Sequence, residues 1–292
     1  MIRIGLIGSE SMHARAFAQA CNVADKDGVY QVPGAKVAAV YGVDDTAAHT
    51  AAVQAEGKIP LCVNSLQELS EHCDAFMVLT RRGSAHIPYV SEIIKSGAPV
   101  FINKPVCSSY EEIEQLRGLA AQSRSLICGG SAMKYCRQVR QMKKMIEKGK
   151  AGQIRGGTIN HSADMDSVYD GIFFYLPHAV EMMLELFGYA PKSLRTTVLS
   201  HDNFSVCVKY EDCLVNLVLN GAAPSYIMLC GKESIVRKVD DRDIFAETMR
   251  DFVGRIRKGE RTSDVERLVK SIQVILAVQK SIETGRETAV CT

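Results

Sequence analysis

The first candidate site lies at the start of the chain, where an apolar run ends in a glycine. Residues 2–7 are mainly aliphatic, Gly8 follows them, and apolar residues recur at helical spacing over 14–21. This order predicts a buried strand, a tight turn and a helix. Such a turn brings a ligand to the helix N-terminus, where free N–H groups and the helix dipole favour the diphosphate of a dinucleotide. The chemistry expected here is dinucleotide binding.

The glycine pattern of that turn is incomplete. Glycine usually stands at the first, third and sixth positions, so that the backbone can approach the diphosphate. Here Gly8 supplies the first, whereas Glu10 and His13 take the other two. A carboxylate at position 10 opposes an anionic ligand unless its side chain turns away. The turn therefore predicts a Rossmann-type start and leaves dinucleotide binding open. Its candidate ligand contacts are Gly8, Ser9, Glu10, Ser11, Met12 and His13.

A second strand is expected over 36–41, and the residue at its end usually holds a ribose. An Asp or Glu there binds the ribose hydroxyls in NAD-binding proteins. Gly42 takes that place and Asp44 follows, so ribose recognition has either moved to Asp44 or been lost. Asp44 is equally suited to cap the next helix, over 47–55. No Arg follows the strand, which argues against the 2′-phosphate of NADP.

Strands and helices then alternate up to residue 128. Further strands are expected over 60–63, 74–79, 100–102 and 125–128, and capping boxes open helices after Ser65 and after Ser108–Ser109. This alternation predicts a doubly wound parallel sheet, whose ligand crevice lies beyond the carboxyl ends of its strands. Either Arg81 or Arg82 could contact the phosphate of the dinucleotide at this edge and offset the negative charge of Glu10. The candidates at that edge are Thr80, Arg81, Arg82, His86, Asn103, Lys104 and Pro105.

The pattern changes near residue 129. A helix over 134–148, a strand over 153–162 and a helix over 176–186 precede five strand-like runs, at 193–199, 204–210, 213–219, 226–230 and 234–238. Consecutive strands joined by short turns predict a largely antiparallel open sheet in an α+β domain. Two helices, over 243–258 and from 265 to about 285, close the chain.

The expected fold is therefore α/β with two domains. Residues 1–128 form a dinucleotide-binding Rossmann domain, and residues 129–292 form an α+β substrate and oligomerisation domain. We expect the final helices to pack back toward the first domain.

Composition excludes several classes of protein. The 292 residues carry a net charge of +2 without a basic run, so no nucleic-acid partner is expected. No apolar stretch of membrane length and no signal-peptide pattern is seen, which predicts a cytoplasmic protein without a membrane partner. The ten cysteines include no C-x-x-C pair, so no metal site is expected. Instead Cys62, Cys128, Cys207 and Cys230 are predicted to be small core residues.

Alternating apolar residues on the expected strands of the second domain predict a homo-oligomer. Val206, Val215, Leu217 and Leu219 alternate along two expected strands and would give the open sheet an apolar face. Such a face is usually covered by another subunit, so a homodimer or homotetramer is expected.

In their order along nearly the whole chain, four motifs resemble the Gfo/Idh/MocA family of NAD(P)-dependent oxidoreductases. They are the turn at Gly8, Thr80 with His86 downstream, Asn103-Lys104-Pro105 in place of Glu-Lys-Pro, and the segment 177–181 in place of a His-x-x-Asp helix. The resemblance implies oxidation of a secondary hydroxyl of a sugar, inositol or related polyol, with NAD or NADP as cofactor. The missing Arg after the second strand favours NAD.

The resemblance also assigns roles to residues. Lys104 matches the lysine that contacts the reacting hydroxyl and helps to place the nicotinamide, and His178 matches the histidine proposed as general base. Imidazole suits proton exchange near neutral pH, and a lysine stabilises negative charge developing on oxygen. Tyr135 and Tyr175 either line the substrate site or pack between the domains. Likewise His161 and residues 164–166 either bound a polyol pocket or form a solvated acidic loop.

Four departures from the family pattern support a second hypothesis. Phe174 stands where many members have Asp four residues before the histidine, and Glu10, Gly42 and Asn103 replace other functional groups. Glu181 keeps a carboxylate one turn after His178, where it either orients the ring or faces solvent. The alternative is a catalytically inactive member that binds a metabolite as a sensor or scaffold.

Overall fold

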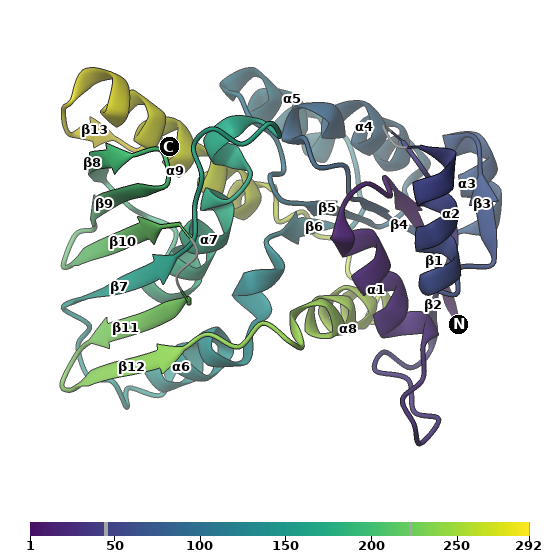
Figure 1. The fold of residues 1–292 in the computed structure, drawn as a ribbon, viewed down its shortest axis with the longest axis horizontal. Helices are drawn as coiled ribbons and strands as arrows, with labels where there is room; N and C mark the ends of the chain where they lie inside the picture. Colours follow the sequence, from purple (N-terminus) through teal and green to yellow (C-terminus); the bar gives the residue numbers. More distant parts are fainter. Residues whose placement is uncertain (44–45, 222–223, 292) are drawn as a thin grey trace. The chain divides into compact units, whose positions relative to one another are not determined.

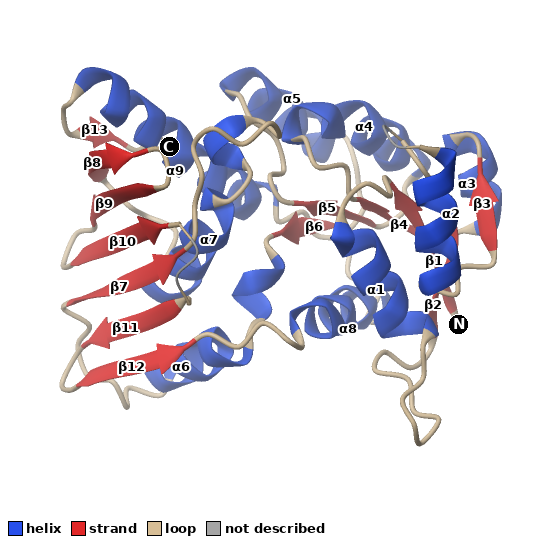
Figure 2. Cartoon of the chain, in the orientation of Figure 1, coloured by secondary structure: helices blue, strands red, loops and turns tan. Residues whose placement is uncertain are grey.

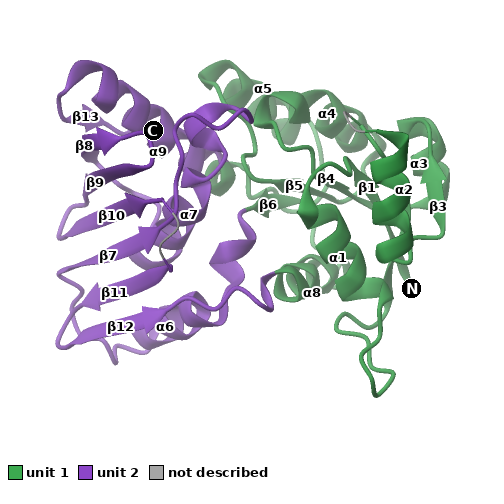
Figure 3. Cartoon of the chain, in the orientation of Figure 1, with its two compact units in different colours: residues 1–130, 245–268 green, residues 131–244, 269–292 purple. Residues whose placement is uncertain are grey.

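The structure, a computed structural model, describes residues 1–43, 46–221 and 224–291. The chain divides into two units, which Figure 3 draws in different colours. The first unit contains residues 1–130 and 245–268, and the second contains residues 131–244 and 269–292. Each unit has its own sheet.

The first unit is built on a six-stranded parallel sheet in the order β3-β2-β1-β4-β5-β6. The predicted doubly wound sheet is confirmed, and the strand order reverses between β1 and β4. Its strands are β1 (Ile2–Ile7), β2 (Ala35–Tyr41), β3 (Leu61–Val63), β4 (Ala75–Val78), β5 (Val100–Asn103) and β6 (Ile127–Gly130). Because ligands bind where the strand order of such a sheet reverses, the residues after β1 and β4 are candidate ligand contacts.

Helices cover both faces of this sheet. Figure 2 shows α4 and α5 on one face and α1 and α8 on the other. The helices of this unit are α1 (Met12–Asn22), α2 (Ala47–Glu56), α3 (Leu66–His72), α4 (His86–Ser96), α5 (Tyr110–Ala121) and α8 (Ile244–Arg257), with a 3₁₀ turn η1 (Gly83–Ala85) before α4.

The capping signals identify the helix starts. Ser65 Oγ accepts a hydrogen bond from Glu68 N at 3.1 Å, and of the two serines at 108–109 it is Ser109 that caps α5, accepting from Glu112 N at 3.2 Å. The N-cap of α2 is Thr46, whose Oγ1 accepts a hydrogen bond from His49 N at 3.2 Å. Asp44 itself lies outside the described residues.

The core of the first unit joins distant parts of the chain. Phe17 of α1, Phe101 of β5 and Phe252 of α8 are fully buried, and both neighbouring ring pairs meet edge-on with centroids 5.9 Å apart. Burying a phenylalanine contributes about 1.5–3 kcal/mol. α8 therefore packs into the core formed by residues 1–130, although more than a hundred residues separate it from them in the sequence.

The second unit contains a seven-stranded sheet in the order β12-β11-β7-β10-β9-β8-β13. Only the neighbours β7 and β10 run parallel in the described sheet, so the prediction of a largely antiparallel sheet is confirmed. Its strands are β7 (Gly156–His161), β8 (Ser193–Ser200), β9 (Asn203–Lys209), β10 (Leu214–Asn220), β11 (Tyr226–Cys230), β12 (Ser234–Lys238) and the unpredicted β13 (Thr288–Ala289).

The helix expected over 134–148 is in fact two elements. A 3₁₀ turn η2 (Ala132–Tyr135) comes first, and α6 (Arg137–Glu147) begins after Cys136, whose ψ of 150° is extended. The break has a local cause, because Ser131 Oγ caps η2 by accepting from Met133 N and Cys136 Sγ caps α6 by accepting from Val139 N. The unit also contains η3 (Gly171–Phe173), α7 (Leu176–Phe187) and most of α9 (Val265–Thr284).

Helices of the same chain cover the apolar face of the second unit's sheet. Figure 1 shows α6, α7 and α9 along one side of this sheet. Val206, Val215, Leu217 and Leu219 are fully buried on that side, and α9 is tied to β8 by Ser281 Oγ, which accepts from Thr196 N at 2.9 Å. The expectation that this apolar face needs a second subunit is therefore wrong, since helices of the same chain bury it.

The cysteine prediction is partly wrong. The ten cysteines, all of which are described, are not in disulfide bonds. Cys128 is buried as expected, but Cys62 and Cys207 are exposed and Cys230 is half-buried. Cys207 lies on β9 between the inward-facing Val206 and Val208, so its side chain points to the outer face. Among the described residues, no helix is long and apolar enough to cross a membrane.

Candidate functional site

The turn after β1 is held closely between its neighbours. Gly8 N donates to Tyr41 O at 2.9 Å, and Gly8 has a φ of 96°. A Cβ at this position would lie 2.8 Å from Thr80 N at the end of β4. Glycine is therefore required here by both the backbone conformation and the space. Ser11 Oγ then caps α1 by accepting from His13 N at 3.2 Å.

A cation from the loop after β4 contacts the same turn. Arg81 Nη2 donates to the backbone carbonyl of Glu10 at 2.9 Å. The guanidinium thus lies beside the turn in which Glu10 replaces the second glycine. The positive charge of Arg81 and the N-terminus of α1 both favour an anion at this place.

The end of β2 leaves no room for a ribose-binding acid. A Cβ at Gly42 would overlap Thr50 Oγ1, which lies 2.8 Å from Ser9 Oγ in a buried hydroxyl pair. The space is therefore filled by Thr50 of α2, and Ser9 bonds within the protein. Asp44, the other candidate for holding the ribose, lies outside the described residues.

His13 and Asn103, the residues that replace the third glycine and the Glu of Glu-Lys-Pro, are hydrogen-bonded to each other. Asn103 Oδ1 and Nδ2 lie 3.2 and 3.0 Å from His13 Nδ1. The His13 ring also packs against Phe245, with centroids 5.0 Å apart. Burial and then the nearby positive Lys104 lower the pKa of His13 to about 4, so the ring is neutral at physiological pH. The sequence indicated each residue separately, and the fold pairs them.

The remaining residues of this edge differ in exposure. Lys104 is 4% exposed at the end of β5, beside Pro105, which lies against Gly83. Thr80 is buried, and its carbonyl lies 2.9 Å from Nε2 of the fully buried His86. The other two candidates, Arg82 and Met12, are exposed.

These observations bear on whether a dinucleotide fits the first unit. The close turn at Gly8, the N-terminus of α1 and the guanidinium of Arg81 suit a diphosphate. Gly42 offers no acid for a ribose. The described residues therefore fit the cofactor at its diphosphate, whereas Gly42 does not supply the usual carboxylate contact at the end of β2.

The second unit places two histidines in contact. His178, in the first turn of α7, has its Nδ1 2.7 Å from Ser131 Oγ, and its ring centroid lies 5.4 Å from that of His161 at the end of β7. His161 Nδ1 lies in turn 2.6 Å from Ser225 Oγ. Each imidazole therefore has a serine hydroxyl at Nδ1.

Glu181 forms a buried ion pair with Lys134. It is 4% exposed, and its carboxylate pairs with Lys134 Nζ at 3.1 Å and accepts from the backbone N–H of Ser131. Burial raises the pKa of Glu181, and Lys134 opposes that shift. The alternative of facing solvent is wrong, because the carboxylate is buried against the segment that follows β6, where it contacts Lys134 and Ser131.

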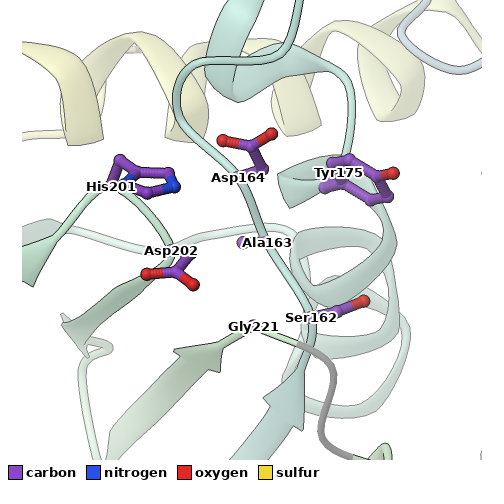
Figure 4. Close-up of a pocket in the computed structure, with 7 residues that line it drawn as sticks. All are labelled: Ser162, Ala163, Asp164, Tyr175, His201, Asp202 and Gly221. Carbon is purple, nitrogen blue, oxygen red and sulfur yellow. The ribbon is translucent and has the colours of Figure 1, made fainter.

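A pocket of about 360 Å³ opens at the edge of the second sheet where β7 and β10 end (Figure 4). It is lined by Ser162, Ala163, Asp164, Tyr175, His201, Asp202 and Gly221. None of these described lining residues is Lys or Arg. A hydrogen bond from Ser200 lowers the pKa of Asp202, so this carboxylate is ionised at neutral pH. Such a pocket suits a polar ligand that is neutral or positively charged.

Aromatic rings lie next to this pocket. Phe174, which lies four residues before His178, packs against Tyr169 and Tyr175 at centroid distances of 5.1 and 4.8 Å. Tyr135 lies away from the pocket lining, with Lys134 Nζ 5.5 Å from its ring centroid.

Several residues that lie in these sites of the second unit were not predicted from the sequence. Ser131 directly follows β6, and its place at a strand end was the available signal. His201 and Asp202 lie in the turn between β8 and β9, and Ser225 precedes β11. A turn in an antiparallel sheet carries no such signal, because only the folded sheet shows which turns share an edge.

The N-terminal part of the chain matches the model of a known protein family. Residues 2–129 match the model of an oxidoreductase family with an NAD-binding Rossmann fold, GFO_IDH_MocA. Over 148 residues the chain is 28% identical to YceM of Salmonella typhimurium, a protein named as an oxidoreductase. That match covers 50% of this chain and 47% of YceM, so the chain spans about half the length of this curated relative.

Solved structures with similar folds include two inositol dehydrogenases. The scyllo-inositol dehydrogenase of Lactobacillus casei, with bound NAD(H) and scyllo-inositol, has a TM-score of 0.84 at 16% identity over 100% of both chains. The myo-inositol 2-dehydrogenase of Lactobacillus plantarum has a TM-score of 0.83 at 14% identity over 99% of both chains. At these identities the similarity establishes the fold.

Proposed function

We propose that the chain, whose residues 2–129 match the model of the oxidoreductase family GFO_IDH_MocA, is a member of that family and transfers a hydride between a nicotinamide dinucleotide and a secondary hydroxyl of a polyol. The substrate class is a sugar, an inositol or a related polyol. The family match is the observation that carries this proposal. The similarity in fold to two inositol dehydrogenases supports the same class of substrate.

In this proposal the cofactor lies along the carboxyl edge of the first sheet. Its diphosphate meets the turn at Gly8 and the N-terminus of α1, with Arg81 as a counter-charge. When bound, the nicotinamide supplies the hydride acceptor for oxidation or the hydride donor for reduction. We favour NAD over NADP because no Arg follows β2 to hold a 2′-phosphate.

Two residues carry the proposed chemistry. As the substrate is oxidised, the carbinol C–H bond breaks with its electron pair leaving as hydride, the hydroxyl proton leaves, and a C=O bond forms. We assign His178 as the base that accepts the proton and Lys104 as the cation that stabilises negative charge on the oxygen. Burial of Lys104 strengthens that interaction, because few water molecules screen its charge.

We propose that the pocket of the second unit, whose lining residue Tyr175 lies three residues before His178, binds the hydroxyl groups of the polyol that do not react. Asp164, Asp202, Ser162 and Tyr175 offer acceptors and donors for several hydroxyl groups. The carboxylates would repel a sugar phosphate or a sugar acid. We therefore propose an uncharged polyol in preference to a phosphorylated one.

Cofactor binding tests the premise of the proposal. NADH and NADPH are titrated into the purified protein while nicotinamide fluorescence is followed, and saturable binding of at least one is expected. Turnover is then measured with a panel of inositols, sugars and sugar acids. Lys104→Ala and His178→Ala are each expected to lower kcat by 10² or more. Lys95→Ala and His72→Ala are matched controls. Absence of saturable binding would remove the enzyme proposal.

Two observations favour a second candidate function, a catalytically inactive sensor or scaffold. Thr50 fills the place of the ribose-binding acid, and Asn103, in the place of a family Glu, is engaged by His13. In that case a polyol binds without oxidation. Dehydrogenation of any polyol in the panel, dependent on Lys104, contradicts the second candidate.

We also propose that the second unit forms a homodimer or homotetramer through the outer face of its sheet. The helices of the chain cover the inner face, whereas Leu199, Leu214 and Val236 on the strands are 82%, 53% and 51% exposed. Light scattering of the wild type and of Leu199→Lys/Leu214→Lys tests this. A wild-type monomer, or an assembly unchanged by the double substitution, would contradict it.

A further inference from the structure

We infer that Ser131 orients the imidazole of His178 in this protein, and that the buried pair of Lys134 and Glu181 holds Ser131 in place. The inference rests on the proposed function only for the role of His178 as the base. Ser131 is a positioning residue in this account, because it acts through His178.

The hydroxyl of Ser131 is fixed by two contacts. Ser131 is fully buried, and its Oγ accepts from Met133 N at 3.1 Å as the cap of η2. The same Oγ lies 2.7 Å from Nδ1 of His178. Because the cap uses one lone pair, the hydroxyl proton and the second lone pair remain for the imidazole. Rotating the hydroxyl group away from His178 would also disturb the start of η2.

The backbone of Ser131 is fixed from the same helix that carries His178. Glu181 lies one turn after His178 on α7, and its carboxylate accepts from the N–H of Ser131 and from Lys134 Nζ at 3.1 Å. α7 thus contacts the segment 131–134 at two successive turns, through His178 and through Glu181. Two contacts of this kind determine both the position and the direction of the Ser131 side chain.

The hydroxyl changes the chemistry expected of the base. A carboxylate beside an imidazole holds the proton on Nδ1 and stabilises the imidazolium form. The position four residues before His178 carries Phe174, and Ser131 is neutral, so its bond orients the ring without adding a charge. The titratable groups on the neighbouring elements are His161 of β7, Lys134 of η2 and Glu181 of α7. Placing a carboxylate at position 131 is therefore expected to make His178 easier to protonate.

NMR of the full-length protein labelled with ¹⁵N-histidine tests the inference without cofactor. The His178 resonances are assigned by their loss in His178→Gln. In Ser131→Asp, which keeps an acceptor for the cap, the pKa of His178 is expected to rise by about one unit. In Ser131→Ala, the Nδ1 shift of His178 is expected to move, while in Ser131→Thr it stays near the wild-type value. Ser225→Ala is the matched control, because it removes the hydroxyl beside His161.

Kinetics provide a second readout. Ser131→Ala is expected to lower kcat about 10-fold or more with little change in the KM of the cofactor, and Ser131→Thr to recover most of the loss. If Ser131→Ala fails to fold, the Asp and Thr variants decide the question. An unchanged His178 pKa in folded Ser131→Asp overturns the inference. NMR shifts as expected, without turnover of any polyol, would instead reject the proposed function and leave the orientation of His178 standing.

Discussion

Replacing Lys134 with methionine should produce a stability defect that grows with pH. Lys134 Nζ lies 3.1 Å from Glu181 Oε2, and their side chains are 12% and 6% exposed. Removing one partner of a buried ion pair leaves an uncompensated charge and typically costs about 3–5 kcal/mol. Methionine keeps most of the volume of lysine, so the expected loss comes from the charge rather than from a cavity.

The pH dependence follows from the pKa of Glu181. Burial already raises this pKa above its ordinary value of 4.5, and removing Lys134 should raise it further. A carboxyl group with a raised pKa in the folded state binds protons more tightly there than in the unfolded chain. Its stabilising contribution is therefore complete below about pH 4.5 and is lost as the pH rises through the folded-state pKa. The difference between variant and wild type should be smallest at pH 4.5 and should grow as the pH rises to 8.

Urea unfolding followed by circular dichroism measures this difference in the free energy of unfolding at pH 4.5, 6 and 8. Lys192→Met is the matched control, because Lys192 pairs with Glu211 at 3.0 Å while both side chains are more than half exposed. Its expected effect is below about 1 kcal/mol. Adding Glu181→Gln to Lys134→Met should restore much of the stability at pH 8. A loss that is the same at every pH, or no larger than that of the control, would refute the argument.

Three further predictions concern the first unit. The pKa of His13 is lowered from 6.5 to about 4. The wild type should therefore lose up to about 3 kcal/mol of stability as the pH falls from 6.5 to 4. His13→Gln should remove this loss when the free energy of unfolding is compared at pH 7 and 4.5. Gly8→Ala should lower the free energy of unfolding by about 2–4 kcal/mol, because φ is 96° and the new Cβ would crowd Thr80; a thermal midpoint equal to that of the wild type would contradict this. Arg81→Gln should weaken cofactor binding about 10-fold and reduce its sensitivity to salt in fluorescence titrations, with Arg15→Gln as a control of equal charge.

Local patterns were enough to predict most of the helices and strands and the parallel arrangement of the first sheet. The alternation up to residue 128 predicted the parallel sheet and the strand ends at Thr80 and Asn103, because the spacing of apolar residues and the repeated crossover helices are visible in a single stretch of chain. The caps at Ser65 and Ser109 were predictable for the same reason, since each contact spans three residues. The Ser131 cap is as local, yet it was not predicted, because it lies between the end of β6 and the helix expected over 134–148.

The partners of the site residues depended on the complete fold. Asn103 engages His13 across 90 positions, and Ser131 reaches His178 across 47. Such pairs depend on strand register and helix packing, which bring distant segments together with ångström precision and leave no periodic trace in either segment. The same reason explains the misjudged apolar face, because an alternating strand shows that one side must be buried without showing that α7 and α9 of the same chain bury it.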